Sequence, residues 1–140
     1  MQAKRFGDVW LVRIDAGEDI PTSLLAFAEE NDIKLATLGG LGAVDHAKYG
    51  LFDPEQKKFV PNIKDEYLEV VSVDGTLSTM GGKPYLHLHA TFADVEGRVF
   101  GGHVNEARVS ATAEISVHIM PGSIDRSFDE TTGLNLMVLE

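Results

Sequence analysis

The sequence contains no cysteine among its 140 residues. Disulfide bonds, thiolate metal sites and cysteine nucleophiles are therefore excluded. A transition-metal site in this chain would need histidine and carboxylate ligands, a set that favours zinc or another metal with affinity for imidazole. Apolar residues make up 44% of the chain and charged residues 24%, which is typical of a globular protein. This length and composition predict a single domain, residues 1–140.

Positive charge is also scarce. The chain has 12 Lys and Arg against 22 Asp and Glu, a formal net charge of -10. Affinity for nucleic acid depends on many basic contacts to phosphate, so direct nucleic-acid binding is not expected. Long apolar runs are missing as well, and none approaches the roughly 20 residues of a membrane span. We therefore expect no membrane contact and a cytoplasmic location.

The spacing of apolar residues predicts one helix and many short strands. The helix is expected over residues 21–31, with Asp19 as its N-cap and Pro21 in its first turn. Turns are expected at Asp74-Gly75 and at 81–83. Strands are predicted over 8–15, two pieces within 34–52, 58–60, 66–73, 76–79, 85–93, 98–104, 108–119 and 134–139. This order predicts an α+β fold, a twisted and mostly antiparallel sheet or half-barrel with one main helix packed on it.

Residues 38–43, LGGLGA, bring three glycines within four positions. A phosphate-binding loop is one reading of such a run. The segment lacks the lysine of a Walker motif and does not match GxGxxG, so a bend or bulge between two strand pieces is the favoured interpretation.

The most informative segment is the predicted strand 85–93, YLHLHATFA. Alternate residues of a strand share a face, so His87 and His89 lie on one face, about 6.7 Å apart along the strand. The other face carries apolar residues and is expected to face the core, namely Leu86, Leu88, Ala90 and Phe92. The strand therefore places two imidazoles together on the side away from the core.

The following turn determines where a third histidine lies. If Val95-Glu96-Gly97 forms a three-residue loop with Gly97 in the left-handed conformation, His103 pairs directly with His89. His87 then lies on the diagonal, and three imidazoles converge. A loop of two or four residues would place His103 on the opposite face.

This register predicts a metal site formed by His87, His89 and His103. Three histidine ligands leave a fourth position open, as in catalytic zinc sites. The alternative is that these are ordinary histidines with hydrogen-bond partners. For His46 and His118, which have no such neighbours in the sequence, that alternative is favoured.

With these motifs the sequence resembles the plants-and-prokaryotes-conserved (PPC) domain in its stand-alone prokaryotic form. The resemblance extends over essentially the whole chain, and its most specific part is the HLH motif followed by Gly97 and GGH. The residues that carry it are Arg13, 17–20 (GEDI), 38–43 (LGGLGA), 50–53 (GLFD), Glu69, 87–89 (HLH), Gly97, 101–103 (GGH) and Glu114.

The resemblance implies an antiparallel sheet with a helix, a homotrimer, and a fold similar to that of acetolactate decarboxylase, a zinc enzyme that also uses three histidines. In plants the domain follows an AT-hook in nuclear DNA-binding proteins, where it mediates protein–protein assembly. This chain has no Arg-Gly-Arg-Pro segment. Association with DNA is therefore implied by the resemblance alone, and no residue here is assigned to DNA binding.

Two functions remain open. The first is a trimeric, zinc-binding domain of regulatory or assembly role, with a protein partner. The alternative is a zinc-dependent lyase or hydrolase that acts on a small molecule. An enzyme would need a general acid or base and a cation for a developing oxyanion, and Glu69 and Arg13 are the candidates. Their alternative interpretations are a solvated strand residue and a surface or interface ion pair.

Overall fold

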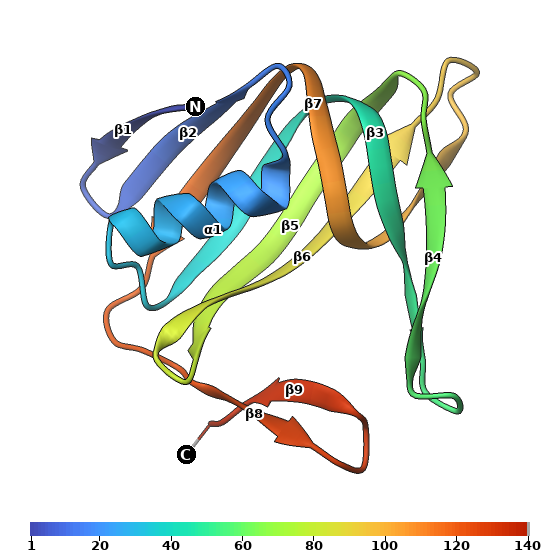
Figure 1. Cartoon of the computed structure of the whole chain (residues 1–140). Helices are drawn as coiled ribbons and strands as arrows, with labels where there is room; N and C mark the ends of the chain where they lie inside the picture. The colour runs from blue at the N-terminus through green and yellow to red at the C-terminus, as the bar shows by residue number, and fades with distance from the viewer. Residues whose placement is uncertain (140) are drawn as a thin grey trace.

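A computed structural model describes residues 1–139, which form one helix and nine strands (Figure 1). The helix α1 extends over Ile20–Glu30. The strands are β1 (Gln2–Phe6), β2 (Val9–Asp15), β3 (Ala36–Asp53), β4 (Lys58–Lys64), β5 (Leu68–Met80), β6 (Lys83–Ala93), β7 (Val99–Ile119), β8 (Arg126–Asp129) and β9 (Leu134–Met137).

The helix begins and ends within one residue of the prediction. Asp19 caps its N-terminus, since the Asp19 carboxylate accepts a hydrogen bond of 3.0 Å from the Thr22 amide. The second carboxylate oxygen of Asp19 accepts from the Ala107 amide at 2.7 Å, which fastens the helix start to β7. The apolar face of the helix packs on the sheet through buried Ile20, Leu24, Phe27 and Ala28.

Seven strands form one sheet in the order β1-β2-β7-β6-β5-β3-β4, and neighbouring strands are antiparallel. Strand β7 also pairs with β3, so that β3, β5, β6 and β7 close on one another. The closure is irregular because the register shifts along β3, first between Gly40 and Gly42. The predicted antiparallel sheet with one helix is confirmed, and it is not a regular barrel.

A second, two-stranded sheet of β8 and β9 lies at the end of the chain, below the main sheet in Figure 1. It is held to β5, where the Thr79 amide donates to the Ile124 carbonyl at 3.0 Å. The predicted strand 134–139 is found as β9, while β8 and β1 were not predicted.

Two predicted breaks are wrong. Asp74-Gly75 is not a turn but the middle of β5, and the predicted strands 98–104 and 108–119 are one strand, β7. Gly75 is required for close packing, because a β-carbon there would overlap the His87 carbonyl of β6. Likewise, the glycines of 38–43 lie inside one continuous strand, β3, where they accompany a register shift.

Helix α1 has 11 residues, and no helix within residues 1–139 is long and apolar enough to cross a membrane.

Candidate metal centre

The hairpin of β6 and β7 has the predicted register. His89 pairs directly with His103. The Asp94 amide donates to the Arg98 carbonyl at 3.1 Å, and Gly97 has a φ of 76°, which is the left-handed conformation expected of a three-residue loop. All three histidines therefore lie on one face of the hairpin.

The opposite face of β6 belongs to the core. Leu88 is 2% exposed and Phe92 is completely buried, whereas His87 and His89, on either side of Leu88 in the strand, are exposed. Burial of these alternate apolar side chains fixes which way the strand faces, because a slip of one residue would bury both imidazoles. The core thus determines the direction in which the histidines point.

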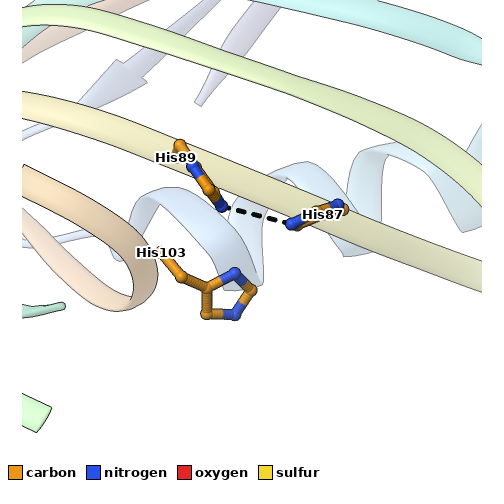
Figure 2. Close-up of side chains that lie close together, drawn as sticks. All are labelled: His87, His89 and His103. Atoms are coloured by element: carbon orange, nitrogen blue, oxygen red, sulfur yellow. Dashed lines mark hydrogen bonds between the residues drawn. The ribbon is translucent and has the colours of Figure 1, made fainter. Parts of the chain in front are cut away.

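The three imidazoles converge (Figure 2). One ring nitrogen from each of His87, His89 and His103 can be chosen so that all three atoms lie within 4.8 Å of one another. The Nε2 atoms of His87 and His89 are 3.2 Å apart. A tetrahedral zinc with Zn–N bonds of about 2.0–2.1 Å separates its nitrogen ligands by about 3.4 Å, so the cluster is close to the geometry that zinc requires.

Two glycines position His103. A β-carbon on Gly101 would overlap the Ala90 carbonyl of β6, and one on Gly102 would overlap the Gly50 carbonyl of β3. The GG of the GGH motif therefore allows β7 to lie close between β6 and β3. His103, which pairs with Gly50 on the β3 side, is held at this crossing of three strands.

The surroundings favour the neutral form of two of the imidazoles, those of His87 and His103. Partial burial lowers the pKa of His87, and the nearby His89 and Arg126 lower it further. Partial burial likewise lowers the pKa of His103, with added effects of His87 and His89. Because only a neutral imidazole can bind a metal through its nitrogen lone pair, these shifts favour the ligand form.

The cluster opens into a cavity of about 520 Å³. Its walls are mostly apolar, and the Phe59 ring meets His103 edge-on at 5.7 Å between centroids. Among residues 1–139 no Asp or Glu lines this cavity, so a metal held by the three histidines would keep an open coordination position. The lining residues are Gly50, Leu51, Phe52, Phe59, Tyr85, His87, His89, Gly102, His103, Asn105, Arg126, Leu134, Asn135 and Leu136.

The structure does not bring Glu69 and Arg13 into this cavity. Glu69 is exposed on β5 opposite Ala93. Arg13 lies on β2, where its guanidinium Nε is 2.9 Å from the Asp15 carboxylate. Catalytic roles for these two residues stay predictions, and the arrangement within one copy of the chain lends them no support.

Two residues near the histidines were missed. Asp74 lies directly across from His89 on β5, which puts its carboxylate on the histidine face, whereas it was predicted only as part of a turn. Arg126 on β8 lines the cavity although it is only 9% exposed. No local pattern points to Arg126, because its partner Ser78 is 48 residues away.

His46 and His118 do not join the cluster. The Nδ1 atom of His46 is 2.6 Å from the Asp65 carboxylate, and its Nε2 atom is 3.4 Å from Glu106. For His46 the interpretation as a hydrogen-bonded histidine is confirmed.

Comparison with known proteins identifies a family that matches most of the chain. The family model described as the Plants and Prokaryotes Conserved (PCC) domain matches residues 1–121. Among curated proteins, the bifunctional protein GlmU of Synechococcus sp. (strain JA-3-3Ab) is 28% identical over 131 residues, which cover 89% of this chain. The chain spans only 19% of that relative's length.

Solved structures give the same result. A Bacteroides thetaiotaomicron protein described as a "putative DNA binding protein" is 27% identical with a TM-score of 0.95, covering 98% of this chain and 96% of that one. A metal-containing protein of Archaeoglobus fulgidus is 34% identical with a TM-score of 0.87, covering 96% of each chain. A plant- and prokaryote-conserved (PPC) protein of Pyrococcus horikoshii is 29% identical with a TM-score of 0.87, covering 99% and 94%.

A more distant neighbour supports the expected likeness to acetolactate decarboxylase at the level of fold. A Staphylococcus aureus protein described as similar to that enzyme is 13% identical with a TM-score of 0.58, covering 86% of this chain and 54% of that one.

Proposed function

This chain belongs to the Plants and Prokaryotes Conserved domain family, and on that premise we propose that it is a zinc-binding domain with a regulatory or assembly role. His87, His89 and His103 would hold the metal. The observation that carries the proposal is the convergence of three imidazoles beside a cavity, with no carboxylate of residues 1–139 in its lining. Zinc would supply a Lewis-acid centre there, and the open position would accept water or a ligand.

Several features support zinc. The chain has no cysteine, and all three ligands are imidazoles, a set that suits zinc among the common metals. The similar Archaeoglobus fulgidus protein is described as containing a metal. The spacing of the His87 and His89 nitrogens also requires little adjustment to fit a tetrahedral ion.

We further propose that the working form is a homotrimer. The outer face of the sheet has a hollow lined by residues of β1, β2, β3 and β7. In it Leu11 and Leu41 are 53% and 54% exposed, and Arg13 and Glu114 form a cross-strand pair beside them. Large exposed apolar side chains next to opposite charges are typical of a surface that another copy covers.

Any association with DNA would run through a protein partner. The net charge of -10 opposes contact with phosphate. The similar Bacteroides thetaiotaomicron protein is described as a "putative DNA binding protein". Fluorescence anisotropy with duplex DNA at physiological salt tests this directly. We expect no binding by the isolated domain, and saturable, salt-sensitive binding would contradict the proposal.

The cavity favours one alternative, a zinc-dependent lyase or hydrolase that acts on a small molecule. A mostly apolar cavity of about 520 Å³ next to an open metal position is the usual setting of such chemistry. The reaction would also need a general base, and no Asp or Glu of residues 1–139 lines the cavity. We therefore place this function second.

X-ray absorption spectroscopy of zinc-loaded protein, with zinc titration of the metal-free chain, tests the proposed site. We expect one zinc per chain, with three nitrogen ligands and one oxygen ligand at about 2.0–2.1 Å. Native mass spectrometry of the same sample should show trimers. Absence of tight zinc binding, or an oxygen-only environment, would contradict the metal site, and a stable monomer would contradict the trimer.

A further inference from the structure

The cavity beside the three histidines contains a buried arginine. Arg126 begins β8, and its side chain reaches back to β5. Its Nε atom donates to the Ser78 hydroxyl at 2.8 Å, and its Nη1 atom donates to the Asn135 carbonyl at 2.8 Å. Its Nη2 atom makes a long contact of 3.4 Å with the Thr76 hydroxyl. All three acceptors are uncharged.

The charge of Arg126 therefore has no counter-ion within residues 1–139. The contrast with three other arginines is clear, since Arg13, Arg98 and Arg108 each pair with an aspartate at 2.9, 2.7 and 2.7 Å. Those three are at least half exposed, whereas Arg126 is 9% exposed. Burial of a charge is costly unless an opposite charge compensates it, so the one buried arginine would be expected to have a partner.

The free donors of Arg126 are suited to a carboxylate. A guanidinium has five N–H groups, and the contacts above use one on each of its three nitrogens. One N–H remains on Nη1 and one on Nη2. Both of these N–H groups can donate to a carboxylate.

The position of Arg126 connects it to the metal centre. Arg126, His87 and His103 line the same cavity. Thr76, which Nη2 contacts, pairs directly with His87 across β5 and β6. The guanidinium is thus held on the histidine face, and the Tyr85 ring lies 4.7 Å from it.

The other residues that line the cavity indicate what kind of ligand it can hold. Its apolar walls are formed by Leu51, Phe52, Phe59, Leu134 and Leu136. The polar groups besides Arg126 and the histidines are neutral, namely the Tyr85 hydroxyl and the Asn105 and Asn135 amides. A few polar groups within apolar walls are the usual features of a site for a small organic molecule.

We propose that this cavity binds a small organic carboxylate, whose charged group pairs with Arg126 and whose apolar body lies against the leucine and phenylalanine side chains. The other end of the ligand faces the three histidines. The inference rests on the proposed function where the metal is concerned, and the pairing with Arg126 is independent of it. In a chain with a net charge of -10, such binding depends on this local cation.

Calorimetric titration with isovalerate tests the proposal, because isovaleramide has the same shape without the charge. We expect isovalerate to bind zinc-loaded protein at least about tenfold more tightly than isovaleramide, since the charged hydrogen bonds are lost in the amide. Equal binding of acid and amide, or no binding of isovalerate, would overturn the proposal. Tighter binding of inorganic phosphate than of isovalerate would overturn the assignment of a carboxylate.

The matched variants are Arg126→Gln and Arg108→Gln. Isovalerate affinity should fall at least about tenfold in R126Q and stay unchanged in R108Q, because Arg108 is exposed and pairs with Asp45. Unchanged affinity in R126Q would mean that the carboxylate binds elsewhere, for example on the zinc alone, and would overturn the role of Arg126. If R126Q does not fold, the comparison of acid and amide on the unaltered protein decides.

Zinc titrations of the same samples separate the two proposals. Tight zinc binding without isovalerate binding leaves the metal function intact and overturns the carboxylate site. Binding of isovalerate to metal-free protein, lost in R126Q, supports the carboxylate site even if zinc does not bind.

Discussion

Two regions of this molecule contain histidines in opposite electrostatic settings. His46, on β3, lies between the carboxylates of Asp65 and Glu106, and its pKa is raised, chiefly by the hydrogen bond to Asp65. His87 and His103 lie near other imidazoles and Arg126, and their pKa values are lowered, chiefly by burial. The same residue type is thus stabilised as a cation in one region and as a neutral ligand in the other.

The difference shows that a histidine close to carboxylates is a weaker candidate for a metal ligand than one close to other histidines. Around His46 the acidic groups already have a positive charge to pair with once the ring is protonated. Around the three histidines no carboxylate of residues 1–139 lines the cavity, and the ion pairs between histidine and carboxylate in these residues are those of His46. Four changes to the chain test this contrast.

Removal of two of the three clustered imidazoles should abolish zinc binding. We expect His87→Ala with His89→Ala to reduce zinc from about one ion per chain to almost none, because one remaining imidazole cannot hold the ion. His46→Ala is the matched control and should keep its zinc. Elemental analysis after dialysis measures both, and full zinc content in the double variant would rule out the proposed ligands.

The second change displaces a ligand without removing it. In Gly102→Ala the new β-carbon meets the Gly50 carbonyl, so β7 must move away from β3 next to His103. We expect the free energy of unfolding to fall by about 1–3 kcal/mol and zinc affinity to weaken. Guanidinium denaturation and zinc titration measure the two effects.

Gly82→Ala is the control for backbone strain, because Gly102 and Gly82 both have a positive φ, of 153° and 78°, but Gly82 has open space around it. It should lose some stability and keep the zinc affinity of the unaltered chain. If G102A binds zinc as tightly as G82A does, the glycine does not position His103.

The third change tests why the pKa of His46 is raised. Asp65→Asn removes the carboxylate that contributes most to the raised pKa of His46, so that pKa should fall towards the ordinary value of 6.5. NMR titration of the imidazole protons measures the shift. Asp45→Asn, which disturbs only the pair with Arg108, should leave it unchanged. An unaltered His46 titration in D65N would contradict the assigned cause.

The smallest effect concerns stability and pH. Because the folded pKa of His46 is raised above 6.5, its contribution to stability is fully present below pH 6.5 and is lost as the pH rises through the folded pKa. The unaltered chain should therefore exceed His46→Gln in unfolding free energy by more at pH 5.5 than at pH 9. The difference should be under about 1 kcal/mol, since Asp65 is mostly exposed. A larger advantage at pH 9 would reverse the expected sign.

The parts of the fold that were predictable depend on local rules. The helix start followed from a capping aspartate and a proline, and the pairing of His89 with His103 followed from a short loop that ends in Gly97. The break at Asp74-Gly75 was wrongly predicted because a glycine in a strand can serve close packing as well as a turn. The break between 104 and 108 was wrongly predicted because long-range pairing with β3, of Glu106 with Lys48 and of Ala107 with Ala47, keeps that segment in β7.

The site was predictable only in part, because local rules reach the histidines but not the residues brought in by long-range packing. Its three histidines lie within 17 residues of one hairpin, where alternation and loop length determine geometry. Arg126 reaches the cavity through contacts with residues about 50 positions earlier, and no periodic pattern encodes such a contact. Long-range packing of β8 against β5 decides its position.

The three histidines are close together in the sequence, and this affects the order in which the cavity forms during folding. Closing a short loop costs little chain entropy, so β6 and the start of β7 can meet early during folding, before β3 completes its pairing with β7. A metal ion could then be captured by a nascent hairpin, whereas Arg126 arrives only when the end of the chain docks. Folding in the presence of zinc would therefore order the two halves of the cavity in sequence, with the ion first and the arginine last.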